Sequence, residues 1–110
     1  MTPQHKQLAE GRWFQLSLME QLANVGSEVE RTLSWQEKNN VPYRNLAFDR
    51  TLELLSLTIA DAKNRKRLKE LTRTREVLID FFCFDNQYCS SPDLWRKYFH
   101  AFNWAARRDR

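Results

Sequence analysis

The stretch LELLSLTIA, residues 52–60, decides the fold class of this 110-residue chain. Its apolar residues occupy more than one side of a helical turn, which is typical of a helix at the centre of a bundle or of one with a face covered by another subunit. The sequence Asn39-Asn40-Val41-Pro42 precedes it and supplies cap-type residues and a proline suited to a first helical turn. We therefore expect a helix that ends near Ala60.

A second periodic segment lies upstream, from Arg12 to about Lys38. Its apolar residues recur at intervals of three and four, at Leu18, Leu22, Val25, Val29 and Leu33. This spacing predicts a helix with one buried stripe. Gly26 lies inside it and costs on the order of 1 kcal/mol relative to alanine. Close approach of a neighbouring helix, or of a ligand to the backbone, would compensate for that cost.

Two further helices are expected downstream. After a break at residues 61–64, Leu68, Leu71, Leu78 and Phe82 form one row, with Arg75 in the same row. Ser91 and Pro92 suit the N-cap and first position of a last helix, whose apolar side is Trp95, Tyr98, Phe99, Phe102 and Ala106. Two glycines and three prolines are too few for the many turns of a β-sandwich or barrel. The sequence predicts an all-α, up-down antiparallel four-helix bundle, a single domain of residues 12–110, with residues 1–11 as a flexible N-terminal arm.

Composition restricts the location and chemistry of the protein. No run reaches the roughly 18 apolar residues that a membrane-spanning helix needs, and the first ten residues lack the apolar core of a signal peptide. We expect a cytoplasmic protein. Cys83 and Cys89 have no metal-site spacing, and only two histidines are present. We therefore expect neither a metal ion nor a cofactor.

The segment Lys63–Arg75 has the strongest charge pattern, with seven cations against the single anion Glu70. The candidate binding residues on this basic third helix are Lys63, Arg65, Lys66, Arg67, Lys69 and Arg73. Such a surface fits salt-sensitive contacts to an RNA or DNA backbone or docking onto an acidic partner protein; plain solubility is the third interpretation. The first hypothesis is a binding module that catalyses nothing. Because the chain has more aromatic residues than a small bundle easily buries, we also expect a homo-oligomer.

Polar residues inside the helical rows form a second candidate set. They are Asn24, Glu28, Arg31, Asp49, Arg50, Glu53, Arg75 and Glu76. In a bundle they could meet as an internal ion-pair network or line a pocket for a small polar molecule. Both alternatives remain open on the sequence.

The last helix carries the one pattern that suggests catalysis. Arg96, His100, Asn103 and Arg107 are spaced four, three and four, so they project from one face. A histidine can act as general acid or base near neutral pH, and arginines can hold a phosphate during RNA cleavage. The alternative hypothesis is therefore a metal-independent endoribonuclease that uses Arg96, His100 and Arg107. A solvent-facing polar stripe is the structural alternative.

A short four-helix chain with a late arginine and histidine resembles the HEPN superfamily of bacterial helical-bundle proteins. That resemblance implies either an RNase of a toxin–antitoxin pair or a companion of a nucleotidyltransferase. The family motif has four to six residues between its arginine and histidine, whereas three separate Arg96 from His100. The opening WFQLSLMEQLANVGSEVERTLSW is also similar to a group of small bacterial proteins without an assigned activity.

Overall fold

The structure is a computed structural model that describes residues 11–108, and its regular elements are all helical. They are η1 (Arg12–Gln15), α2 (Leu18–Glu37), α3 (Val41–Ala60), η2 (Ala62–Arg67), α4 (Leu68–Cys83) and α5 (Pro92–Arg108), where η denotes a 3-10 helix. The all-α prediction with four long helices is confirmed. Residues 1–10 of the predicted arm lie outside the described part of the chain.

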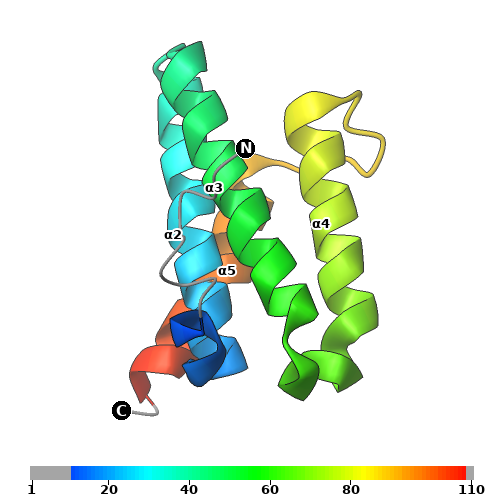
Figure 1. Cartoon of the computed structure of the whole chain (residues 1–110). Coiled ribbons are helices and arrows are strands. Elements are labelled where there is room, and N and C mark those ends of the chain that lie inside the picture. The colour runs from blue at the N-terminus through cyan, green and yellow to red at the C-terminus, as the bar shows by residue number, and fades with distance from the viewer. Residues whose placement is uncertain (1–10, 109–110) are drawn as a thin grey trace.

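The helices pack around one core. α2 contacts α3 on one side and α5 on the other, and α4 packs against α3 (Figure 1). α2, α3 and α4 run in alternating directions along the bundle (Figure 1); the complete up-down order stays a prediction. Leu22, Val25, Leu33, Leu55, Leu71 and Leu78 are among the most deeply buried side chains. Tyr98 joins α5 to α4, because its hydroxyl lies 3.1 Å from both the Thr74 hydroxyl and a Glu70 carboxylate oxygen.

The first predicted helix is divided, and its early part is not α-helical. Ser17 begins α2 with a capping box: its hydroxyl accepts from the Glu20 N–H at 3.1 Å, and the Glu20 carboxylate accepts from the Ser17 N–H at 3.0 Å. Such a box satisfies the free donors of a helix start. The chain therefore turns before Ser17, and Trp13 enters the core from η1 with 1% of its surface exposed.

The predicted starts of α3 and α5 are confirmed. The Asn40 side chain accepts from the Tyr43 N–H at 3.1 Å, and the Ser91 hydroxyl accepts from the Leu94 N–H at 3.2 Å. Pro92 is the first residue of α5, as its fixed φ favours.

Gly26 lies where α2 and α5 approach closely. A β-carbon at this position would be 2.6 Å from Cβ of Phe99. That distance is far inside van der Waals contact, so only glycine lets the two backbones come together here. Of the two explanations that the sequence leaves open, helix approach accounts for this residue.

No helix in residues 11–108 combines the length and the apolar character needed to cross a bilayer.

Candidate functional site

The basic segment is built differently from the prediction. Residues Lys63 to Arg67 belong to the 3-10 helix η2, and α4 begins only at Leu68. Asp61 ends α3 and caps η2, because its carboxylate accepts from the Lys63 N–H at 3.1 Å. The expected single basic helix is thus a 3-10 segment followed by an α-helix.

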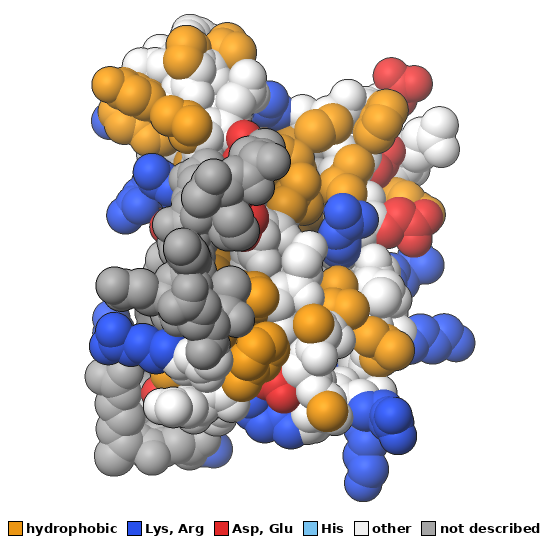
Figure 2. Space-filling model, in the orientation of Figure 1, with side chains coloured by type: hydrophobic (Ala, Val, Ile, Leu, Met, Phe, Trp, Pro, Cys, Tyr) orange, Lys and Arg blue, Asp and Glu red, His pale blue; other side chains and the backbone are white. Residues whose placement is uncertain are grey.

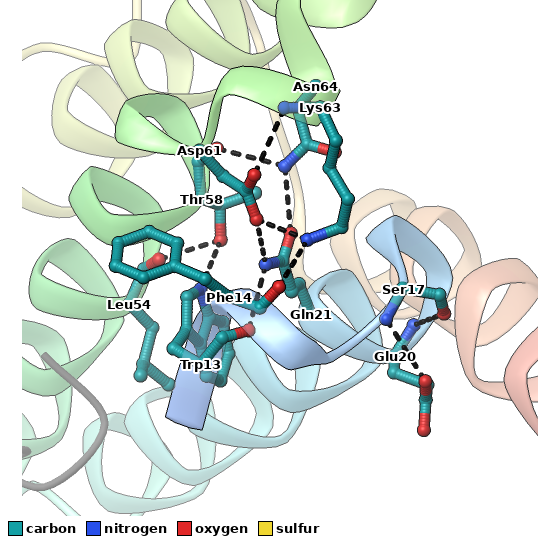
Figure 3. A network of polar contacts seen from close by, with 10 residues as sticks. All are labelled: Trp13, Phe14, Ser17, Glu20, Gln21, Leu54, Thr58, Asp61, Lys63 and Asn64. Atoms are coloured by element: carbon teal, nitrogen blue, oxygen red, sulfur yellow. Dashed lines mark hydrogen bonds and ion pairs between the residues drawn. The ribbon is translucent and has the colours of Figure 1, made fainter. Parts of the chain in front are cut away.

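Asn64 anchors η2 to the rest of the bundle. Its side chain is 3% exposed and donates to the Gln21 side chain at 2.8 Å and to the Thr58 carbonyl at 3.0 Å (Figure 3). A 3-10 helix has three residues per turn, so Arg67 lies on the same side as Asn64. Arg65 and Lys66 consequently point away from the bundle, and both are exposed.

The polar cluster around this anchor joins four elements. Trp13 donates from its indole N–H to the Thr58 hydroxyl at 3.2 Å, and the Gln21 amide donates to the Trp13 carbonyl at 3.1 Å and to Asp61 at 2.9 Å (Figure 3). Lys63 forms an ion pair with Asp61 and donates to the Phe14 carbonyl at 3.0 Å. Burial of Asp61 disfavours its charge, but hydrogen bonds from Lys63 and Gln21 outweigh this effect and lower its pKa.

Sequence reasoning missed this cluster. Gln21 and Asn64 are polar residues that bond each other across 43 positions, and Gln21 bonds Asp61 across 40. Thr58 lies between the apolar residues Leu57 and Ile59. Asp61 as a cap residue was the one local signal. The cluster is internally satisfied and positions η2 rather than offering a site of its own.

The six predicted basic residues divide into two groups. Lys63 and Arg67 are held by ion pairs, Lys63 with Asp61 and Arg67 with Glu70 at 2.8 Å. This hydrogen bond raises the pKa of Arg67 and lowers that of Glu70. The others, Arg65, Lys66, Lys69 and Arg73, are exposed and form no ion pair within residues 11–108. We call these four the basic surface. Figure 2 shows lysine and arginine side chains projecting around η2 and the start of α4, at the lower end of the view.

Arg73 is the member of the basic surface farthest along α4. Its guanidinium lies over the ring of Tyr88, 5.3 Å from the ring centre, and the Tyr88 hydroxyl donates to Glu76 at 3.0 Å. That hydrogen bond raises the pKa of Tyr88. Arg73 is thus oriented by an aromatic ring, whereas no ring within residues 11–108 lies under the remaining three cations.

Two of the three predicted catalytic residues, Arg96 and His100, line a cleft of about 390 Å³ between α2 and α5, together with Asn103, Ser27 and Gly26. The Arg96 guanidinium is already paired with two carboxylates. It donates to Glu30 at 2.8 and 3.2 Å and to Glu37 at 2.8 Å. These two carboxylates raise its pKa further and neutralise the charge that a phosphate would need.

Arg107 lies far from the other two predicted catalytic residues. It is eleven residues beyond Arg96 on the same helix, and a rise of 1.5 Å per residue separates their backbones by about 16 Å. His100 is exposed. The arrangement therefore does not bring two arginines and the histidine around one phosphate.

The polar residues predicted to meet inside the bundle are dispersed. Asn24 donates to the Glu20 carbonyl at 2.8 Å on its own helix, and Glu28 pairs with Arg31 at 3.2 Å, also within α2. Glu76 contacts Tyr88, and Arg75 is exposed. The remaining members, Asp49, Arg50 and Glu53, lie half-buried on α3. The contacts of Asn24, Glu28, Arg31 and Glu76 are thus local to a helix or its adjoining loop, and these four residues do not meet in one pocket.

Arg75 is exposed because Thr74 takes the inward position. The Thr74 hydroxyl hydrogen-bonds the Glu70 carbonyl at 2.9 Å and approaches Tyr98. The buried row of α4 is Leu71, Thr74, Leu78 and Phe82, and Leu68 of the predicted row is 42% exposed.

The described residues contain neither a metal-binding cluster nor a disulfide. Among residues 11–108, no three His, Cys, Asp or Glu side chains are grouped to hold a metal ion. Cys83 and Cys89 are free and exposed. Comparison of the chain with models of known protein families, with curated proteins and with solved structures found no match.

Proposed function

We propose that this protein is a non-enzymatic helical-bundle module that binds the phosphate backbone of a nucleic acid through its basic surface. The observation that carries the proposal is the exposure of Arg65, Lys66 and Lys69 without an ion-pair partner in residues 11–108. Two cations elsewhere, Arg31 and Arg96, are instead neutralised by glutamates. Unpaired cations on a rigid support bind phosphates with little reorganisation.

An acidic partner protein is the alternative occupant of the basic surface. Protein interfaces draw most of their affinity from buried aromatic or aliphatic anchors. Among the cations of the basic surface the described chain exposes two large apolar side chains, Leu68 and Tyr88, and Tyr88 already carries the guanidinium of Arg73 on its ring. Phosphate contacts need no such anchor. The composition of the surface therefore favours a nucleic acid.

A salt series with two charge-matched variants tests the proposal. The first variant replaces Arg65, Lys66 and Lys69 with glutamate. The control replaces Arg31, Lys38 and Lys97, which are also exposed, and changes the net charge equally. Fluorescent single-stranded RNA and duplex DNA are titrated at several salt concentrations, and RNA integrity is followed in the same samples.

We expect salt-sensitive binding that the first variant weakens and the control largely keeps. Loss of three phosphate contacts should reduce the slope of log affinity against log salt by about 2 on a single strand. Equal loss in both variants would mean that only net charge matters, and absence of binding at low salt would favour an acidic protein partner. RNA cleavage that disappears in His100→Ala would replace the proposal with the endoribonuclease hypothesis.

A further inference from the structure

Trp104 is an exposed tryptophan on the outer side of α5. It is 56% exposed, whereas Trp13 and Trp95 are buried and Trp35 is half-buried. Its neighbours Phe102 and Ala106 face the core, and residues two positions apart in an α-helix point to nearly opposite sides. The position of Trp104 is therefore set by the helix register and places an aromatic face in solvent.

A cation lies over this ring. The guanidinium of Arg108 is 4.9 Å from the ring centre, and Arg107, three residues beyond Trp104 on the same helix, is exposed. From residue 94 to residue 108 the chain has no aspartate or glutamate. An aromatic ring among cations is the combination with which proteins hold unpaired bases and their phosphates.

The end of α5 lies at the same end of the bundle as η2 and the start of α4, at the bottom of Figure 1. Arg107 and Arg108 are thus at the end that carries Arg65, Lys66 and Lys69. The whole bundle measures 35 × 30 × 25 Å, so one short strand can reach across this end.

We propose that this end of the bundle binds single-stranded nucleic acid, with a base stacked on Trp104 and phosphates held by Arg107 and the basic surface. This inference rests on the proposed function and adds the strand preference. In a duplex the bases are already stacked and paired, so Trp104 would find no free base face. A single strand offers both bases and phosphates.

A membrane surface fits this face less well. Helices that lie on membranes keep a continuous apolar side exposed. The apolar side of α5 is buried, with Trp95, Phe99 and Phe102 all in the core, and Trp104 is the one large apolar side chain that its second half exposes.

The test compares Trp104→Ala with Phe84→Ala in the full-length protein. Phe84 is a matched control because it is 73% exposed and follows α4 at the opposite end of the bundle (Figure 1). Both variants are titrated with a fluorescent single-stranded RNA of about 15 nucleotides, a duplex of equal length and anionic phospholipid vesicles. Thermal unfolding of both variants checks that they remain folded.

We expect Trp104→Ala to weaken single-strand binding at least about fivefold, the lower limit for one lost stacking contact. Duplex binding and the salt slope should remain unchanged, and Phe84→Ala should bind like the original protein. RNA should also quench tryptophan fluorescence in the original protein but not in Trp104→Ala.

Three results would overturn the inference. Unchanged single-strand binding in Trp104→Ala, with binding still lost on charge reversal of the basic surface, would refute stacking and leave the proposed function intact. Equal affinity of the original protein for the single strand and for the duplex would likewise refute stacking and leave the proposed function intact. Trp104-dependent binding to vesicles without binding to nucleic acid would refute both proposals in favour of a membrane surface.

Discussion

Replacement of Gly26 by alanine should destabilise the protein, although the same change at an exposed helical position would stabilise it. The added Cβ would lie 2.6 Å from Cβ of Phe99. That atom is attached directly to the backbone of α5, so no rotamer change of Phe99 can move it away. α2 and α5 must separate, and the packing between them must loosen.

Two opposing contributions set the magnitude. Overpacking a well-packed interface costs typically about 1–3 kcal/mol, and the better helix propensity of alanine returns about 1 kcal/mol. We expect a net loss of about 1 kcal/mol in the free energy of unfolding. For a chain of 110 residues that loss lowers Tm by about 4 °C.

Thermal unfolding followed by circular dichroism measures this loss, with Ser27→Ala as the control. Ser27 neighbours Gly26 on α2 but is exposed, so its replacement tests propensity without a steric clash. A higher Tm for Gly26→Ala would refute the reasoning, because it would show that α2 and α5 do not approach as closely as the structure places them.

Three further predictions concern the core, the polar cluster and the surface. Leu55→Ala should lower the free energy of unfolding by about 2–5 kcal/mol in urea denaturation, because Leu55 is fully buried; a loss below 1 kcal/mol would contradict its core position. Asp61 has a pKa below its ordinary 3.8, so it stabilises the fold above that pH and the contribution disappears as pH falls through the lowered pKa. Acid unfolding should be less steep in Asp61→Asn, and identical pH profiles would show that the carboxylate is not held as described. Arg96→Ala removes exposed contacts to Glu30 and Glu37 and should cost less than about 1 kcal/mol by thermal unfolding; a larger loss would mean that this ion pair is structural.

Much of the fold could be predicted from local sequence, because apolar spacing and cap residues act over one or two turns. Asn40, Ser91 and Pro92 mark helix starts that the structure confirms. The sequence also contains a signal for the break before α2, because Ser17 and Glu20 have the spacing of a capping box. The prediction overlooked this signal because apolar residues continue upstream of Ser17.

The interior polar residues could not be predicted. Whether Thr74 or Arg75 faces the core depends on Tyr98, which lies 24 positions away from Thr74. Asn64 can be buried because Gln21 and Thr58 accept the hydrogen bonds of its side chain. Such partners are brought together only by tertiary packing, and propensity alone places these residue types at the surface. The same limit applies to the pairing of Arg96 with two glutamates of α2.

The 3-10 geometry of η2 explains how a highly charged segment remains docked. With three residues per turn, the inward row contains Asn64 and Arg67, and Arg65 and Lys66 face outward. Asn64 is uncharged, and its hydrogen bonds are buried, so salt screens them far less than it screens exposed charges. Salt should therefore weaken the phosphate contacts of the outward cations while η2, which positions them, stays folded. A binding titration at several salt concentrations then reports the loss of these phosphate contacts and not the unfolding of η2.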